Sequence, residues 1–248
     1  MVQLLVSVRS ADEVGPALAG GADIIDAKEP ARGSLGAVSR AELGRILASV
    51  PARCPISIAL GDLTAVADVG VALDGLDVGT RAGPVYLKLG FAGVRATARI
   101  QTMIENAGRL GANISRAIRV VAVAYADADR ADTVTPALVL QLAGSAGAAG
   151  VLLDTHVKDG RRLLDWLDPS ALRTWVTAAR ESGLVAALAG ALEPTDFELM
   201  YGIGPDVVGV RGAACEGGRE GLVTAERVSA LRQALRHSNR EMAVGKSS

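Results

Sequence analysis

Short apolar runs alternate with amphipathic segments from one end of the chain to the other. The apolar runs are rich in β-branched residues and almost continuous in hydrophobicity, which is typical of parallel strands buried on both faces. We predict eight strands, which begin at Gln3, Ala22, Pro55, Pro84, Ile118, Ala149, Leu184 and Asp206. This alternation predicts an α/β fold.

Helical patterns occupy the segments between these runs. The clearest ones begin near Ser39, at about residue 94, after Asp168-Pro169 and at Thr224. Ser39 with Glu42 three residues later is a capping-box signature, and Asp168 followed by Pro169 is a typical helix start. Residues 61–83 contain five glycines. The helix expected there should therefore be short or distorted.

Eight strands with helical segments between them predict a single-domain (β/α)8 TIM barrel. We place the barrel at residues 1–237 and expect a polar, disordered tail at 238–248. No linker divides the chain. The alternative is a doubly wound open sheet, which usually has fewer strands and a glycine-rich turn after the first strand. Here the first strand is followed by SVRSADE, which lacks that turn.

Composition narrows the class of protein and its partners. The chain has 248 residues, half of them apolar, and a net charge of −1. This near neutrality predicts no nucleic-acid partner and no membrane partner. The N-terminal run is typical of a strand and not of a signal peptide, and no run is long enough to span a bilayer. The two cysteines lack the spacing of a metal site. We expect a cytoplasmic protein with a small-molecule substrate, as a monomer or a homo-oligomer.

Lysine is scarce and occupies particular positions. Lys28, Lys88 and Lys158 each follow a strand-like run, and Lys246 lies in the polar tail. Arginine supplies the other 22 of the 26 basic residues, so charge alone does not require lysine at these places. A desolvated lysine can lose its proton and act as a nucleophile or base, whereas arginine cannot. The pattern predicts amine chemistry in one pocket. The alternative is three solvated lysines in loops.

The carboxyl ends of the strands form the active-site face of a (β/α)8 barrel. Asp26 and Lys28 end the second strand and share one face, because side chains two apart on a strand point the same way. Lys88 ends the fourth strand. Asp154 ends the sixth, with Lys158 just beyond it. We expect these five side chains to meet around one mouth.

Crowded ammonium groups lower one another's pKa, and burial lowers it further. One amine in such a group can be neutral near pH 7 and attack a carbonyl to form a Schiff base. For Asp26 and Lys28 the alternative is a structural ion pair at the barrel rim. His156, close to Asp154 in the sequence, is a weak candidate because loop histidines are usually solvated.

Phosphate binding is the second chemistry that the pattern favours. Barrel enzymes often hold phosphate on the loops after strands seven and eight. Those loops contain small residues, whose backbone N–H groups are accessible, and an arginine that offers a charged fork. The expected phosphate-binding residues are Gly190, Arg211, Gly212 and Ala213.

Four segments together resemble the (5-formylfuran-3-yl)methyl phosphate synthase family. They are DAKEPxxGSLGA, YxKLG, LLDTxxKDG and VGVRGAxC, and the resemblance covers about residues 2–235. It implies a barrel that joins two molecules of glyceraldehyde 3-phosphate, without a metal or cofactor, to make the furan precursor of methanofuran-type one-carbon carriers.

The resemblance also implies a role for each residue. The Schiff-base lysine falls on Lys28 and the proton-accepting lysine on Lys88. Asp26, Asp154 and Lys158 fall on supporting positions. Two other hypotheses stay open. One is a different class I aldolase or an Asp-x-Lys decarboxylase of sugar phosphates. The other is a catalytically silent barrel that serves as a scaffold.

Overall fold

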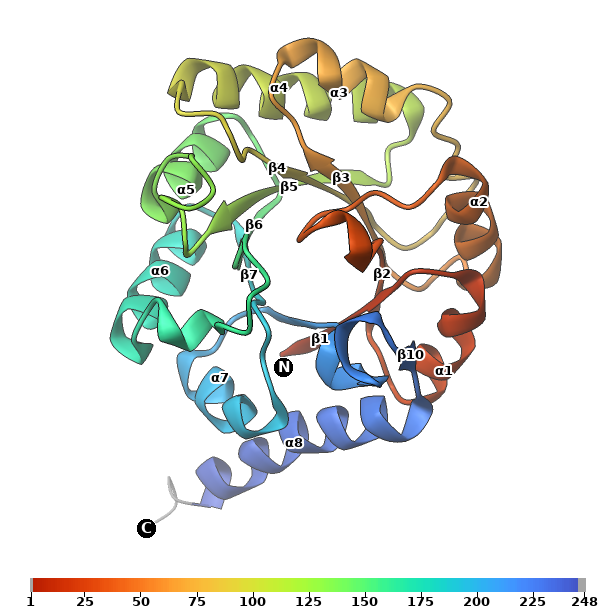
Figure 1. Cartoon of the computed structure of the whole chain (residues 1–248), viewed down its shortest axis with the longest axis vertical. Coiled ribbons are helices and arrows are strands. Elements are labelled where there is room, and N and C mark those ends of the chain that lie inside the picture. Colours follow the sequence, from red (N-terminus) through yellow and green to blue (C-terminus); the bar gives the residue numbers. More distant parts are fainter. Residues whose placement is uncertain (1, 245–248) are drawn as a thin grey trace.

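A closed barrel of parallel strands forms the centre of the molecule (Figure 1). The computed structural model describes the backbone of residues 2–244 and the side chains of residues 2–235. Within that range, eight strands follow one another around the barrel in chain order: β1 Gln3–Val8, β2 Ile24–Ala27, β3 Ile56–Asp62, β4 Val85–Gly90, β5 Ile118–Tyr125, β6 Gly150–Asp154, β7 Val185–Leu188 and β8 Val207–Val210. The first and last strands pair in parallel, with Gln3 opposite Val207. The barrel is therefore closed, and the open-sheet alternative is excluded.

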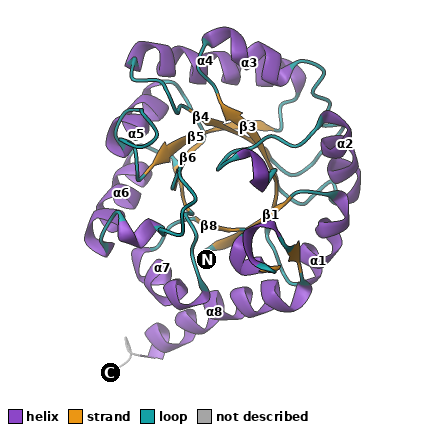
Figure 2. Cartoon of the chain, in the orientation of Figure 1, coloured by secondary structure: helices purple, strands orange, loops and turns teal. Residues whose placement is uncertain are grey.

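Helices surround the barrel as an outer ring (Figure 2). Their bounds are α1 Val14–Ala19, α2 Arg40–Ser49, α3 Val66–Leu73, α4 Thr97–Ile114, α5 Pro136–Ser145, α6 Pro169–Glu181, α7 Phe197–Ile203 and α8 Ala225–Val244. Helix α3, in the glycine-bearing segment, has eight residues, which confirms that it is short. Of the tail expected at 238–248, residues 245–248 lie outside the described residues, and the boundary at 237 stays a prediction.

The cap predicted for α6 is formed in full, whereas only half of the capping box predicted for α2 is formed. Asp168 caps α6 by accepting a hydrogen bond from the N–H of Ala171 at 2.9 Å. Ser39 caps α2 in the same way, through the N–H of Glu42 at 3.2 Å. The Glu42 carboxylate, however, accepts from the N–H of Ala11 at 2.8 Å. It therefore joins α2 to the segment after β1, and the reciprocal half of the capping box is not formed.

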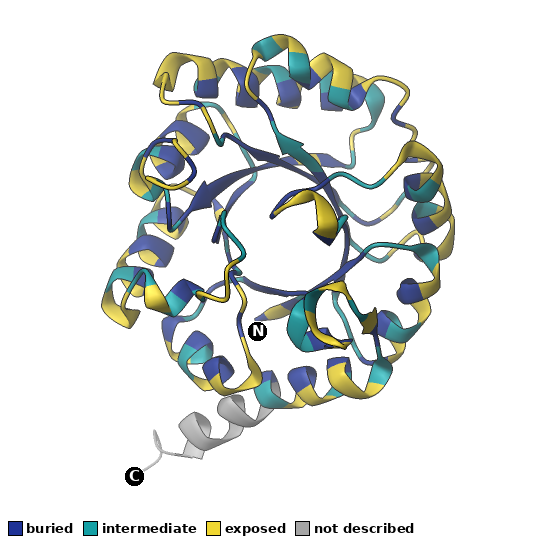
Figure 3. Cartoon of the chain, viewed as in Figure 1, coloured by how far each residue is buried: buried dark blue, intermediate teal, exposed yellow. Residues whose placement is uncertain are grey.

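Apolar residues between the strands and the helices make the main core, and the outward faces of the helices are exposed (Figure 3). A smaller cluster lies on the inner side of the barrel and consists of Leu35, Ala59, Val121, Val123, Tyr125, Ala131 and Leu152. The interior also contains charged side chains, which come from β2, β4 and β6. The odd-numbered strands add small or apolar side chains such as Ser57, Val121 and Ala187. These small side chains leave room for a ligand inside the barrel.

None of the helices in residues 2–244 has the length and apolar character needed to cross a bilayer.

Candidate active site

A cavity of about 610 Å³ lies inside the barrel and opens at the carboxyl ends of the strands. All five charged residues that the sequence singled out line it: Asp26, Lys28, Lys88, Asp154 and Lys158. The expectation that they meet in one place is confirmed. They differ in their partners, and this difference decides what each can do.

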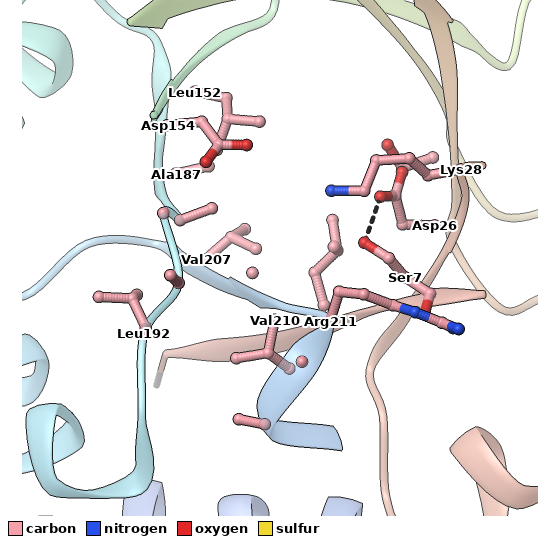
Figure 4. A pocket seen from close by; sticks show the side chains of 18 of the residues that line it. Ser7, Asp26, Lys28, Leu152, Asp154, Ala187, Leu192, Val207, Val210 and Arg211 are labelled. Carbon is pink, nitrogen blue, oxygen red and sulfur yellow. Dashed lines mark hydrogen bonds between the residues drawn. The ribbon is translucent and has the colours of Figure 1, made fainter. Parts of the chain in front are cut away.

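Lys28 is the first residue after β2, and its backbone N–H still pairs with Val8 at 2.9 Å. The side chain points into the cavity, toward the side that carries Asp154 (Figure 4). It is only 7% exposed, yet among the described residues it has no hydrogen-bond or ion-pair partner. Burial is the strongest influence on the amine and lowers its pKa to about 7. Nearby carboxylates and ammonium groups act in opposite directions and do not reverse this effect.

Lys88 and Asp26 form an ion pair inside the barrel. Lys88 Nζ lies 2.7 Å from Asp26 Oδ1, and Asp26 Oδ2 accepts a hydrogen bond from Ser7 Oγ at 2.7 Å. Burial alone would raise the pKa of Asp26. The charges of Lys88 and Lys28 and the Ser7 hydrogen bond outweigh burial, so the pKa lies below its ordinary value. Asp26 is therefore a carboxylate that holds Lys88 in place.

Lys158 and Asp154 form a second pair on the opposite side of the cavity. Lys158 Nζ donates to Asp154 Oδ1 at 2.8 Å and to Thr155 Oγ1 at 3.0 Å. The backbone N–H of Thr155 also donates to Asp154 Oδ1, at 2.7 Å. Burial would raise the pKa of Asp154, but Lys158 and Lys28 lower it below its ordinary value. Two of the three lysines are thus paired, and Lys28 is left with a free amine.

The predicted phosphate-binding residues line the same cavity, but the side chain of Arg211 is bonded within the protein. Gly190, Gly212 and Ala213 face the cavity, and their backbone N–H groups have no acceptor in the described part of the chain. Arg211 points away from the cavity centre (Figure 4).

All five N–H groups of Arg211 are used within the protein. Two bond the Glu13 carboxylate, at 2.6 and 3.0 Å. The others bond the carbonyls of Ser7, Arg219 and Gly221. Arg211 therefore cannot offer the charged fork that the sequence suggested. It ties the end of β8 to the segment after β1.

A polar network at the mouth was not expected from the sequence. Tyr125, at the end of β5, donates to Asp62 at the end of β3 (2.7 Å), and Ser34 donates to Tyr125 at 3.3 Å. Burial and the Asp62 carboxylate raise the pKa of Tyr125 well above its ordinary value, so the hydroxyl stays a donor. The ring of His156 lies edge-on to Tyr125, with centroids 4.9 Å apart. The strand-end rule that found the lysines would also have found this pair.

Arg219 is a second residue that the sequence did not single out. It lies in the short turn Gly218–Glu220 after β8 and lines the cavity. Its Nη2 donates to the carbonyls of Pro30 and Gly33, in the loop between β2 and α2. Among residues 2–235, no group of three or more His, Cys, Asp or Glu side chains is arranged to hold a metal.

Comparison with known proteins gives one consistent result. The sequence model of a family described as 4-HFC-P synthase matches residues 4–232. A (5-formylfuran-3-yl)methyl phosphate synthase from Methanothermobacter thermautotrophicus is 38% identical over 240 residues, covering 94% of this chain and 98% of that protein. The protein of the same name from Methanocaldococcus jannaschii is 37% identical, with 93% and 98% coverage.

Solved structures with lower sequence identity share the fold. KGPDC from Streptococcus mutans superposes with a TM-score of 0.62 at 14% identity, covering 95% of this chain and 98% of that chain. The 3-hexulose-6-phosphate synthase from Salmonella typhimurium gives 0.57 at 18% identity, with 96% and 100% coverage. At these identities the likeness concerns the barrel alone.

Proposed function

The chain belongs to the 4-HFC-P synthase family, and from that premise we propose that it is a (5-formylfuran-3-yl)methyl phosphate synthase. In this proposal it is a lyase-type synthase that joins two molecules of glyceraldehyde 3-phosphate, with loss of one phosphate and two waters. Two three-carbon units account for the four furan ring carbons, the formyl carbon and the phosphomethyl carbon. The product would serve the synthesis of a methanofuran-type one-carbon carrier.

The free amine of Lys28 is the observation that carries this proposal. It is buried, has no partner among the described side chains, and has a pKa of about 7. Close to half of such amines are neutral at pH 7. A neutral amine can attack the aldehyde carbon of glyceraldehyde 3-phosphate, and loss of water then gives an imine.

The imine explains how one site can run several steps. Once protonated, it draws electrons from C2 of the bound triose and makes the C2 proton removable. The resulting enamine can expel phosphate from C3, or it can form a carbon–carbon bond with the second carbonyl. In each route the nitrogen electron pair re-forms the protonated imine, while the displaced pair leaves with phosphate or forms the new carbon–carbon bond. No outside oxidant or reductant is therefore needed.

Proton transfer in this scheme falls to the paired lysines. Lys88 is expected to move protons to and from the bound triose, with Asp26 holding its amine within 2.7 Å. Lys158 and Asp154 lie on the other side of the cavity and are expected to assist the departure of water. Phosphate is expected to contact the backbone N–H groups of Gly190, Gly212 and Ala213.

Incubation with glyceraldehyde 3-phosphate alone tests the proposal. The expected products are free phosphate and a furan that absorbs in the near ultraviolet. Borohydride added during turnover should reduce the imine, and mass spectrometry of the peptides should place the adduct on Lys28. The Lys28→Arg variant keeps the charge but cannot form an imine, so it should give neither adduct nor furan.

The same assay separates the alternatives. A cleaved or decarboxylated sugar phosphate in place of a furan would indicate another aldolase or decarboxylase. An adduct confined to a different lysine would overturn the assignment of Lys28. A complete lack of turnover and trapping with any triose phosphate would indicate a silent barrel.

A further inference from the structure

Arg219 lines the cavity and keeps donors that no other described group uses. Its Nη2 is held by the carbonyls of Pro30 and Gly33, and only this nitrogen has partners. The Nε and Nη1 groups have no acceptor in the part of the chain that the structure describes, and the side chain forms no ion pair there. A ligand in the cavity would therefore lie beside a guanidinium that is not fully used within the protein.

The three lysines that line the cavity are not equally available. Lys88 is paired with Asp26, and Lys158 with Asp154. Lys28 must be neutral when it attacks a carbonyl, so it cannot also neutralise an anion at that moment. A phosphate that enters this cavity needs a positive charge to replace its lost hydration. Arg219 can supply one, because a guanidinium keeps its proton at any working pH.

Arg219 lies beside Gly212, whose backbone N–H is one of the groups expected to contact phosphate. A Cβ built on Gly212 would lie 3.5 Å from the backbone nitrogen of Arg219, so the two segments are in contact. With Nη2 held by the loop, the guanidinium can still donate to a phosphate oxygen from Nη1, in a charge-assisted hydrogen bond. Arg211, the arginine suggested by sequence, has no donor left.

We propose that Arg219 binds a substrate phosphate and makes the site selective for phosphorylated aldehydes over their unphosphorylated counterparts. The identity of the triose rests on the proposed function; phosphate recognition does not. The same side chain holds the loop that begins directly after Lys28. Phosphate binding and the position of that loop are therefore linked through one residue.

Imine trapping with two aldehydes tests this assignment. Wild type, Arg219→Gln and Arg227→Gln are each incubated with glyceraldehyde or glyceraldehyde 3-phosphate, reduced with borohydride, and assayed for adduct on Lys28. Arg227 also lines the cavity but is exposed and lacks a side-chain partner among the described residues, so it controls for loss of charge at the mouth.

In the Arg219→Gln variant, the preference for the phosphorylated aldehyde should fall by about 10- to 100-fold, the range of a charge-assisted hydrogen bond. Trapping of glyceraldehyde should stay within about twofold of wild type, and Arg227→Gln should keep the preference. An equal loss with both aldehydes would mean that Arg219 only holds the loop, and would overturn the proposal. An unchanged preference would overturn it as well.

Calorimetric titration with inorganic phosphate separates this proposal from the proposed function. If wild type forms no imine with any aldehyde, the proposed function fails, and phosphate binding still tests Arg219. Wild type should bind phosphate at least about tenfold more tightly than Arg219→Gln, with circular dichroism confirming that the variant is folded. Arg219→Lys, which keeps the charge but not the guanidinium donors, should be intermediate. Equal phosphate affinity in wild type and Arg219→Gln would refute the assignment.

Discussion

Replacing the free amine of Lys28 by an apolar side chain should make the protein more stable while abolishing activity. The Lys28→Met variant keeps the length of the side chain and removes the group that burial disfavours. Burial moves the pKa of Lys28 from 10.5 to about 7. Because each pKa unit corresponds to about 1.4 kcal/mol, the buried amine costs the folded protein about 4 kcal/mol at pH 7.

The size of this gain should depend on pH in a defined direction. Below pH 7 the amine is protonated in both the folded and the unfolded chain, and the folded state bears the full cost. Above 10.5 it is neutral in both, and the cost vanishes. Between these values the unfolded chain binds more protons, so wild-type stability rises with pH. At pH 9.5 the difference between variant and wild type should have fallen to about 1.5 kcal/mol.

Urea unfolding at pH 7 and pH 9.5, followed by circular dichroism, measures both quantities. Lys158→Met is the matched control, because Lys158 is bonded to Asp154 and Thr155. Without Lys158, the buried Asp154 carboxylate loses its ion-pair partner, so this variant should be less stable than wild type. The reasoning is refuted if Lys28→Met destabilises the protein, or if its gain is the same at both pH values.

Three further predictions concern catalysis and the mouth of the barrel. Imine trapping on Lys28 should fall about tenfold per pH unit below pH 6 and level off above about pH 8, because only the neutral amine attacks; a rate independent of pH would contradict this. Lys88→Gln keeps a donor for Asp26 but cannot exchange a proton, so imine should still be trapped while furan absorbance forms at least about 100-fold more slowly; wild-type turnover would remove Lys88 from proton transfer. Tyr125→Phe loses the hydrogen bond to Asp62 and should lower the free energy of unfolding by about 1–2 kcal/mol in urea titrations; an unchanged midpoint would show that the network contributes nothing.

The barrel could be predicted from sequence because each of its elements leaves a local pattern. Buried parallel strands leave apolar runs, and helix starts leave caps such as Asp168. The gathering of Lys28, Lys88 and Asp154 was predictable for a related reason, since a closed parallel barrel brings all strand ends to one face. Position at a strand end is a property of the local sequence.

The partners of these side chains could not be predicted, because they come from distant parts of the chain. Arg211 is used up by Glu13, which is 198 positions away. The Glu42 carboxylate, expected to close a capping box, accepts from Ala11, which is 31 positions away. Arg219 was passed over because its free donors are apparent only once the loops after β2 and β8 meet. Which charge is paired and which is free is decided by tertiary contacts.

The separation of charged and uncharged side chains between alternate strands has a consequence for how this cavity can change. Asp26, Lys88 and Asp154 come from β2, β4 and β6, whereas Val121 and Ala187 on odd-numbered strands line the same cavity with apolar side chains. A substitution at Val121 or Ala187 alters the room for substrate without replacing an amine or a carboxylate. Evolution or a designer can therefore resize the cavity for longer or shorter aldehydes through the odd-numbered strands. The reactive groups on the even-numbered strands stay unchanged.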